Sequence, residues 1–336
     1  MCGFFFYISK KDLDKKKIKS LDDSANLLKH RGPDNNQKFI SAKIYARHYR
    51  LSILDVKDRS NQPFFSNDKR YMLLFNGEIY NFNSIKKELQ KNYNFKTKSD
   101  TEVLLAAFIK YKEKVVNKIA GMFSFLVYDF KLKKIYIFRD PLGQKPLYYH
   151  IDKSSVLISS EIKPIYNLKS LKLDNEQLKN YFLTNNYAFD KKTIFRDVSQ
   201  LRSGESATIN TLKYEFNEEI TKTYINKKII TKKENIKKFK SNVLNLIKLH
   251  SISDVKMGLA ISSGIDSRSI FLALKKNNLH RKIKRVFFIY FDDFKTEKDE
   301  VLKFCRKFKI KLQMVKIKKE FVIKNLRKNI YFNESP

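Results

Sequence analysis

Cysteine is nearly absent from this 336-residue chain, which has only Cys2 and Cys305. Two thiols cannot build a disulfide framework, and such low use is typical of a reducing compartment, so we expect a cytoplasmic protein. Long apolar runs are also missing, since none approaches the roughly 18 residues of a membrane span. The apolar run at residues 4–8 is too short for a signal peptide and has no basic residues before it. These scarcities argue against a secreted disulfide scaffold and against a membrane protein.

Glycine is the next scarce residue, with only eight in the chain. Average usage is about 7%, so positions that keep glycine are candidates for places where a side chain is not tolerated. They fall in turns and motifs rather than in predicted helix interiors, and they are Gly3, Gly32, Gly77, Gly121, Gly143, Gly204, Gly258 and Gly264.

Acidic residues are outnumbered by basic ones, 35 against 70, which gives a net charge of +35. Such an excess favours a nucleic-acid or anionic-membrane partner. The lysines, however, are scattered along polar helix faces without a zinc-finger, RNP or helix-turn-helix pattern. We therefore interpret the charge as a solvated basic surface and expect no nucleic-acid partner.

The start of the chain carries the first chemical signal. If Met1 is removed, the thiol of Cys2 and a free α-amino group lie on one residue. Their ordinary pKa values, about 8.5 and about 7.7 to 8.0, allow proton transfer from thiol to amine near neutrality. This is an N-terminal nucleophile with its own base. The alternative is a cysteine that lies at the terminus by chance, before an apolar first strand.

The length and the apolar content allow two cores, and we expect two domains. Residues 2–216 are rich in strand patterns and predict an α+β sandwich of two antiparallel sheets. A single strand is expected from residue 40 toward 53, and another at 71–75, ending at Asn76-Gly77. Four consecutive runs predict an antiparallel meander, at 122–130, 134–139, 147–151 and 155–159. Helices are expected at 20–30, 84–91, 101–112 and 175–185.

Residues 217–234 are polar and lysine-rich without a clear period, which predicts a linker. From residue 235 onward, helix and strand patterns alternate, which predicts an α/β domain with a parallel, Rossmann-like sheet over 235–336. The helices are expected at 235–250, 267–276 and 296–308, and the strands at 255–261, 283–291 and 311–317.

A thiolate that attacks a carboxamide needs oxyanion donors and a hold on the charged end of its substrate. Asn76 offers a side-chain donor. Gly77 offers a backbone N–H that the Cβ of any other residue at this position could obstruct. Arg50 can hold a carboxylate with two hydrogen bonds, while Glu78 and Asp100 can accept from an α-ammonium. Taken singly, each has a structural alternative: a hairpin turn, a surface base or a helix cap.

Seven motifs in order change this balance, because together they resemble the class II glutamine amidotransferase domain of glutamine-hydrolysing asparagine synthetases over roughly residues 2–210. The motifs are Cys2-Gly3, His30-Arg31-Gly32-Pro33-Asp34, Arg50-Leu51-Ser52-Ile53, Asn76-Gly77-Glu78-Ile79-Tyr80-Asn81, Ser99-Asp100-Thr101-Glu102, Gly121-Met122-Phe123-Ser124-Phe125 and the run from Arg139-Asp140-Pro141 through Gly143-Gln144-Lys145 to Tyr149.

The resemblance implies an Ntn-hydrolase-like fold and glutamine as a substrate. Cys2 would attack the glutamine amide, form a γ-glutamyl thioester and release ammonia. Asn76 and Gly77 would form the oxyanion hole, and Arg50 would bind the α-carboxylate. The remaining implied contacts are Glu78 and Asp100 to the α-amino group, and main-chain carbonyls from Leu51 to Ile53 to the amide nitrogen.

The second domain carries a loop of small residues, Ser262-Ser263-Gly264-Ile265-Asp266-Ser267, between a strand and a helix. A helix N-terminus after such a loop favours an anion, although a plain capped turn is the alternative and the Walker A pattern is missing. The loop resembles the pyrophosphate loop of ATP pyrophosphatases, which implies ATP and Mg²⁺ as cofactors. The resemblance places Asp266 near the metal, and Ala260 and Ile289 near the adenosine.

Ser263 stands where that pattern usually has glycine, so its Cβ would crowd the phosphate, or its φ would be positive at some cost. By the resemblance, the acceptor is aspartate, which becomes asparagine; a homodimer is an assembly it allows. Family synthetase domains continue beyond the last residues here, so we expect residues 235–336 to be a truncated N-terminal part. Two alternatives stay open: a different acceptor, such as a sugar acid of surface polysaccharide, and a catalytically reduced glutamine-binding module.

Overall fold

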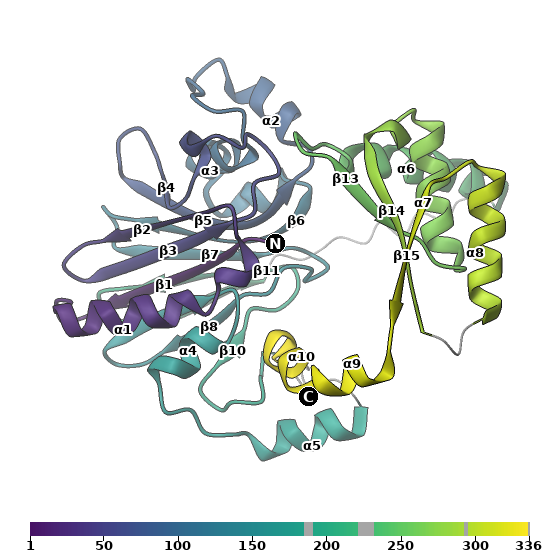
Figure 1. The fold of residues 1–336 in the computed structure, drawn as a ribbon. Coiled ribbons are helices and arrows are strands. Elements are labelled where there is room, and N and C mark those ends of the chain that lie inside the picture. The colour runs from purple at the N-terminus through teal and green to yellow at the C-terminus, as the bar shows by residue number, and fades with distance from the viewer. Residues whose placement is uncertain (185–190, 221–231, 292–294, 335–336) are drawn as a thin grey trace. The chain divides into compact units, whose positions relative to one another are not determined.

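The computed structural model describes residues 1–184, 191–220, 232–291 and 295–334. The chain divides into two compact units, Met1–Ile225 and Asn226–Pro336 (Figure 1). Residues 221–231 of the expected linker lie outside the described residues. Its first residues belong to strand β12 (Glu215–Ile220) and its last to helix α6 (Lys232–His250), so both elements extend further than their patterns indicate.

The first unit contains two six-stranded antiparallel sheets, as predicted. The first sheet has the order β10-β8-β9-β1-β3-β2, and its strands are β10 (Ser199–Gln200), β8 (Tyr148–Ile151), β9 (Ser155–Ser159), β1 (Gly3–Ser9), β3 (Ile44–Arg50) and β2 (Asn35–Ile40). The second has the order β12-β11-β7-β6-β5-β4, with β11 (Glu205–Asn210), β7 (Lys134–Arg139), β6 (Gly121–Asp129), β5 (Tyr71–Ile79) and β4 (Phe64–Phe65).

The two sheets enclose the main core, and helices cover their outer faces. Phe4 and Phe6 of β1 face the second sheet, whereas Phe5 and Tyr7 face helices on the other side. This burial on both faces explains why residues 4–8 are apolar without alternation. Helices α1 (Lys15–Asn26) and α4 (Lys163–Leu168) cover the first sheet, and the buried helix α3 (Asp100–Tyr111) packs on the second (Figure 1). The predicted sandwich is confirmed.

The chain path within the sandwich differs from the predictions in three places. The strand expected from residue 40 to 53 is a hairpin of β2 and β3, because the chain reverses at 41–43 without glycine, proline or an Asn-Gly pair to signal it. Strand β5 does not end at Asn76 but continues to Ile79, paired with Gly121 of β6. The expected meander is split, because β6 and β7 lie in the second sheet while β8 and β9 lie in the first.

Several helices in the first unit shift by a few residues from the patterns. The helix expected at 20–30 is α1 followed by a 3-10 turn at Lys29–Arg31. The other helices are α2 (Phe82–Leu89), α3 and α5 (Asn175–Thr184). Ser99 caps α3 by accepting from the Thr101 N–H, which fixes where that helix begins.

The second unit has the predicted parallel sheet, with the order β13 (Met257–Ala260), β14 (Ile283–Phe291) and β15 (Leu312–Ile317). Helices α7 (Ile265–Lys276) and α8 (Lys295–Lys307) follow β13 and β14, and α9 (Lys319–Lys324) and α10 (Leu326–Asn333) end the described chain. Its core contains Leu259, Phe271, Phe288 and Val301. Across the described ranges of both units, none of the helices has the length and apolar character needed to cross a membrane.

Candidate active site

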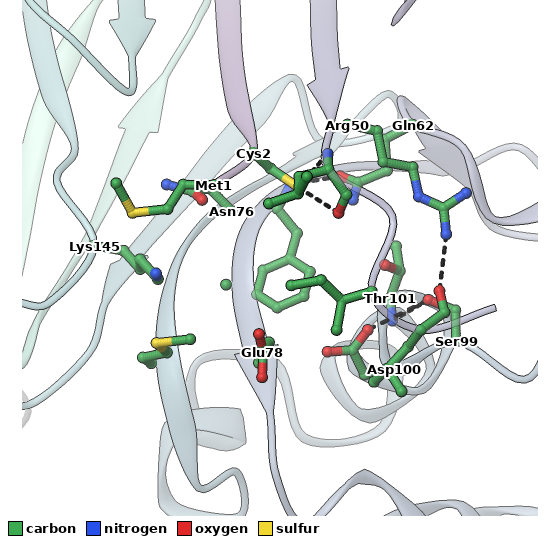
Figure 2. A pocket seen from close by; sticks show the side chains of 16 residues that line it. Met1, Cys2, Arg50, Gln62, Asn76, Glu78, Ser99, Asp100, Thr101 and Lys145 are labelled. Atoms are coloured by element: carbon green, nitrogen blue, oxygen red, sulfur yellow. Dashed lines mark hydrogen bonds between the residues drawn. The ribbon is translucent and has the colours of Figure 1, made fainter. Parts of the chain in front are cut away.

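A small cavity opens beside the first strand of the sandwich (Figure 2). Its volume is about 110 Å³, which is small beside the roughly 300 to 1,000 Å³ of sites for larger ligands. The structure brings together at its wall all eight residues predicted for the first site, namely Cys2, Arg50, Leu51, Ile53, Asn76, Gly77, Glu78 and Asp100. Cys2 directly precedes β1, and the other residues come from β3, β5 and α3, together with the loop after β3.

Cys2 is held at the start of β1, which lies between β3 and β9. The Arg31 side chain donates from Nε to the Cys2 carbonyl at 2.8 Å. A Cβ on Gly3 would lie 2.8 Å from the Cδ of that arginine, so the glycine after the nucleophile lets the two segments approach. Glu161 accepts from Arg31 at 2.8 Å, which fixes the arginine in turn.

The Cys2 sulfur forms hydrogen bonds with Leu51, the first residue of the loop after β3. The Leu51 N–H donates to Sγ at 3.4 Å, and the thiol donates to the Leu51 carbonyl at 3.6 Å. Burial raises the pKa of the Cys2 thiol, while the Leu51 hydrogen bond and the positive N-terminus act in the opposite direction. With Met1 attached, the protein therefore holds Cys2 as a thiol rather than a thiolate.

Every second residue of β5 directs its backbone N–H and C=O groups toward the edge of the strand at the cavity. In an antiparallel strand the N–H and C=O of alternate residues point to the same side. At Phe75 this edge is satisfied by side chains: Gln62 Oε1 accepts from its N–H at 2.7 Å, and His48 Nε2 contacts its C=O at 3.0 Å. At Ile79 the N–H donates to Asp100 at 3.0 Å. Gly77 lies between them, so its N–H points to the same edge.

Asn76 adds a second donor at this edge. Its side chain is only 1% exposed, and its Nδ2 has no hydrogen-bond partner among the described residues. A buried donor without an acceptor costs about 1 to 3 kcal/mol, so it marks a place where an acceptor is expected. Asn76 and Gly77 thus supply two adjacent N–H donors at the wall of the cavity that Cys2 also lines, which suits an oxyanion.

Gly77 is required for a reason other than the predicted access to its N–H. A Cβ at this position would lie 2.1 Å from the Met122 carbonyl oxygen and 2.7 Å from the Phe123 Cα. Both belong to β6, which pairs with β5 at this point. The glycine therefore permits the close approach of two strands, and it is a strand residue rather than part of an Asn-Gly turn.

Arg50 is buried, and its guanidinium organises the loop after β3. Both Nη atoms donate all their hydrogens to this loop, with acceptors 2.6 to 3.0 Å away: the Leu54, Asp55 and Lys57 carbonyls and Asn61 Oδ1. The predicted bidentate hydrogen bonding of Arg50 to a carboxylate would have to compete with these hydrogen bonds. Only its Nε–H is left outside them.

Two carboxyl groups share the far wall of the cavity, as Figure 2 shows for Glu78 and Asp100. Burial raises the pKa of Asp100 to about 6, against the hydrogen bond from the Ile79 N–H. Burial also raises the pKa of Glu78, and the nearby Asp100 charge raises it further. A buried acid and a half-buried acid near each other favour a cationic group of the ligand between them.

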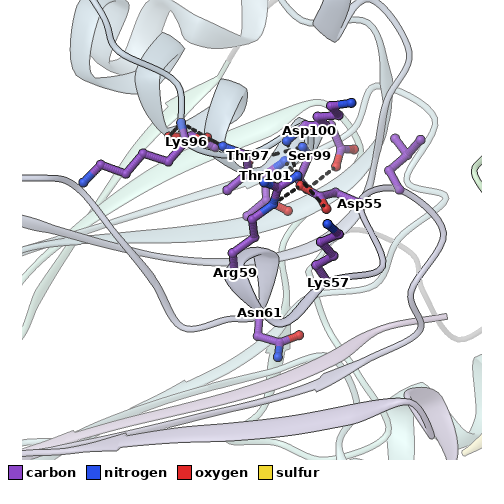
Figure 3. A network of polar contacts seen from close by, with 12 residues as sticks. Asp55, Lys57, Arg59, Asn61, Lys96, Thr97, Ser99, Asp100 and Thr101 are labelled. Atoms are coloured by element: carbon purple, nitrogen blue, oxygen red, sulfur yellow. Dashed lines mark hydrogen bonds and ion pairs between the residues drawn. The ribbon is translucent and has the colours of Figure 1, made fainter.

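A polar network holds the two loops that carry these groups (Figure 3). Asp55 accepts from Arg59 at 3.0 Å and from the Lys98 N–H at 2.7 Å. Glu102 accepts from the Thr97 N–H at 2.6 Å. The loop after β3 is thereby tied to the segment that begins α3, so the guanidinium and the far wall keep fixed positions. Sequence patterns gave no signal for this network, because its members are common surface residue types.

The second candidate loop lies between β13 and α7. The Ser262 N–H donates to Ser267 Oγ at 3.0 Å, and the Ser263 N–H and hydroxyl donate to Glu297 at 3.3 and 3.1 Å. Ser263 does not have the positive φ considered above. A carboxylate of α8 therefore occupies donors of this loop, which are suited to an anion. Asp266 is exposed on the first turn of α7.

The other two residues predicted for the nucleotide lie on the sheet. Ala260 ends β13 and is paired with Phe287 of β14. Ile289, on β14, is 54% exposed. No group of three or more His, Cys, Asp or Glu side chains forms a metal cluster within the ranges that the structure describes.

The sequence assigned no role to several residues of the first cavity, among them Met1, Gln62, Ser99, Thr101, Met122 and Lys145. Four of them, Ser99, Thr101, Met122 and Lys145, lie inside the motifs quoted above, and that was the only signal available. Nothing in the sequence around Gln62 indicates that it binds the β5 edge.

Comparisons with known proteins agree with this geometry. Residues 1–224 match the family described as glutamine amidotransferase domain. The chain is 34% identical over 288 residues to glutamine-hydrolyzing asparagine synthetase 1 of Bacillus subtilis (strain 168), covering 82% of this chain and 44% of the relative. It is 30% identical over 298 residues to a putative glutamine-hydrolyzing asparagine synthetase 2 of Methanocaldococcus jannaschii, covering 80% and 56%. This chain thus spans about half the length of the curated relatives it matches.

A solved structure of the allosteric regulatory enzyme of purine biosynthesis has a TM-score of 0.50 to this chain at 14% identity, covering 94% of this chain and 80% of the other. At that identity the likeness concerns the fold alone. The resemblance seen in the seven motifs is confirmed by the family match and the two synthetases. The chain belongs to the glutamine amidotransferase domain family.

Proposed function

We propose that this chain hydrolyses glutamine to glutamate and ammonia at Cys2, as part of an asparagine synthetase that works in the cytoplasm. The observation that carries the proposal is the buried Nδ2 of Asn76, which has no acceptor among the described residues and lines the cavity that also contains Cys2. A carbonyl oxygen of a bound amide would supply that acceptor.

Removal of Met1 comes first, because it frees the α-amine on the residue that carries the thiol and vacates part of the cavity wall. The amine takes the thiol proton, and the thiolate attacks the amide carbon. Asn76 Nδ2 and the Gly77 N–H stabilise the negative oxygen. The ammonium returns its proton to the leaving nitrogen, the C–N bond breaks, and ammonia leaves a thioester on Cys2.

Water then attacks the thioester carbon, with the α-amine accepting its proton. The C–S bond breaks, glutamate forms, and the thiol is restored. Leu51 contributes to both steps, because its N–H donates to Sγ at 3.4 Å and can hold the thiolate.

The cavity charges suit an α-amino acid. Glu78 and Asp100 would bind the α-ammonium, which offsets the repulsion between the two acids. Arg50 would attract the α-carboxylate, through Nε or in place of one of its loop acceptors. The small volume of about 110 Å³ fits a ligand of amino-acid size better than a larger amide.

We further propose that ATP and Mg²⁺ bind the second unit, where ATP would activate the acceptor carboxylate for attack by ammonia. That the loop can bind a phosphate is supported by its contact with Glu297, because the Ser263 N–H and hydroxyl already donate to one anionic oxygen there. Gly264 and Ser267 would complete the phosphate contacts. Asp266 would be a single protein ligand for Mg²⁺, which commonly binds through one or two carboxylates and the phosphates.

Aspartate is the acceptor that we favour, because the named relatives are asparagine synthetases. This supports aspartate over a sugar acid. The homodimer stays a prediction.

Glutaminase activity tests the central part of this proposal. Wild-type protein, with Met1 removal verified by intact mass, should release ammonia and glutamate in equal amounts. Cys2→Ala and a form that retains Met1 should both lose this activity. Substantial ammonia release by either form would remove Cys2 from the mechanism.

A further inference from the structure

Lys145 is a buried cation in the wall of the first cavity (Figure 2). The residue is only 6% exposed. Within the ranges that the structure describes, its ammonium forms no hydrogen bond and no ion pair shorter than 4.0 Å, and it therefore faces the cavity. A charged side chain in a mostly buried position is partly desolvated, so its presence calls for an explanation.

The backbone around Lys145 is fixed on both sides. Its N–H donates to Asp140 Oδ2 at 3.0 Å, and its C=O accepts from Arg139 Nε at 2.9 Å. Gly143 has a positive φ of 63°, and its C=O accepts from the same arginine at 2.7 Å. The loop between β7 and β8 is therefore shaped to hold the lysine in place.

Glu78 is the acid in this wall that lacks a hydrogen bond or ion pair in the described part of the chain. Asp100, by contrast, accepts from Ile79 and Ser99. The charged groups around Glu78 are Asp100, Lys145 and the N-terminus. Arg50 is not among these groups, and both of its Nη atoms are engaged in the loop after β3.

We propose that Lys145 is a positioning residue of the glutaminase site, whose ammonium lines the same small cavity as Glu78 and supports its carboxylate as the acceptor for the α-ammonium of glutamine. This inference rests on the function proposed above. Lys145 touches no reacting atom in this account; it acts on substrate affinity through Glu78.

The directions of the pKa shifts of Glu78 and Lys145 agree with this role. Burial and Asp100 raise the pKa of Glu78, and Lys145 opposes them. Burial lowers the pKa of Lys145, and Glu78 is the largest influence acting in the other direction. Each of the two groups thus supports the charged form of the other. Without the lysine, Glu78 would hold a proton up to a higher pH and would bind an α-ammonium less well.

The first test compares the steady-state kinetics of Lys145→Met and Lys145→Arg. We expect Lys145→Met to raise the KM for glutamine about 10-fold at pH 7 while kcat changes less than about two-fold, and we expect arginine to restore most of the affinity. Lys153→Met, an exposed lysine in the following hairpin, is the matched control and should change neither. An unchanged KM, or a loss confined to kcat, would overturn the proposal.

The second test uses 4-carbamoylbutanoate, which has the amide and carboxylate of glutamine and no α-amino group. Its inhibition constant should be the same within about two-fold in wild type and Lys145→Met, because it has no ammonium for Glu78 to bind. Equal weakening of glutamine and of this analogue would mean that Lys145 acts on the carboxylate or on the fold, and would contradict the role through Glu78.

A double-mutant cycle separates the same possibilities. In a Glu78→Gln background, Lys145→Met should have no further effect on the KM, whereas independent roles would give additive losses. Wild-type protein without glutaminase activity would overturn both this inference and the proposed function. Active wild type with a Lys145→Met variant of normal KM would overturn only this inference.

Discussion

Cys2 and Leu51 exchange two hydrogen bonds, with the Leu51 N–H donating to Sγ at 3.4 Å and the thiol donating to the Leu51 carbonyl at 3.6 Å. When the thiol ionises, the N–H continues to stabilise the sulfur and the carbonyl loses its donor. That carbonyl then becomes free to accept from the nitrogen of a bound amide. One residue of the loop after β3 can thus respond to the state of the nucleophile.

Replacing Asn76 should separate activity from stability. We expect Asn76→Leu to lower kcat for glutamine hydrolysis by about 100- to 1,000-fold, the usual effect of losing one oxyanion donor. The melting temperature should stay the same or rise, because an unsatisfied buried donor is replaced by an apolar group of similar shape. Asn61→Leu is the control, since it removes hydrogen bonds to Arg50 and Asp58 and should lower the melting temperature. A large drop in the melting temperature of Asn76→Leu would show that Asn76 is structural.

Gly77→Ala, unlike Asn76→Leu, should lose stability as well as activity. The new Cβ would lie 2.1 Å from the Met122 carbonyl oxygen, so β5 and β6 must separate. We expect a loss of about 1 to 3 kcal/mol in unfolding free energy, measured by thermal unfolding, together with loss of activity. At Gly264 the nearest atom to a new Cβ is a serine hydroxyl at 3.3 Å, so Gly264→Ala should be tolerated far better. Equal stability of the two variants would contradict the strand contact.

Asp100 should make the protein less stable as the pH rises. Its pKa is about 6 in the folded chain, against about 3.9 when unfolded. Between these values the folded state holds a proton that the unfolded state has lost, so stability falls as pH rises from about 4 to about 6. Asp100→Asn should therefore gain about 2 kcal/mol relative to wild type between pH 4 and pH 7. Asp12→Asn, at an exposed position, should show no such gain over wild type, and a difference between Asp100→Asn and wild type that does not grow with pH would refute the assignment.

Glu297 should oppose nucleotide binding in the second unit, since its carboxylate accepts from the Ser263 N–H and hydroxyl. We expect Glu297→Gln to raise the affinity for ATP with Mg²⁺ about 10-fold in calorimetric titration, because a negative charge leaves the loop. Glu300→Gln is the control on the same helix, because Glu300 pairs with Arg268 instead. Weaker ATP binding by Glu297→Gln would mean that the glutamate serves the ligand rather than competes with it.

The sequence indicated, through its motifs, half of the residues that line the first cavity, because the motifs contain the residue types expected around a thiol that attacks an amide. Cys2, Arg50, Asn76, Gly77, Glu78 and Asp100 all lie at its wall. It could not place Asn76 and Gly77 inside a strand, because a local Asn-Gly pair signals a turn, whereas the pairing of β5 with β6 depends on a distant segment. Lys145 was marked only by its place in a quoted motif, because the burial of one lysine among 70 basic residues is decided by the tertiary fold.

The fold was predictable to a similar depth. Apolar runs and alternation indicated two sheets and then a parallel sheet, because these patterns reflect burial directly. They could not show that β2 and β3 form a hairpin, since residues 41–43 contain no turn signal. Nor could they show that β8 and β9 leave one sheet for the other, because strand order is decided by contacts far apart in the chain.

Covalent labelling of the nucleophile is the sharpest check on the role of Cys2. The reagent 6-diazo-5-oxo-L-norleucine is a glutamine analogue that alkylates a nucleophile held at the amide position. With Met1 removed, we expect one adduct per chain, found by peptide mass spectrometry on Cys2, in step with loss of glutaminase activity. Cys305, buried in the second unit, should stay unlabelled. Inactivation with the adduct on any residue other than Cys2 would contradict the account.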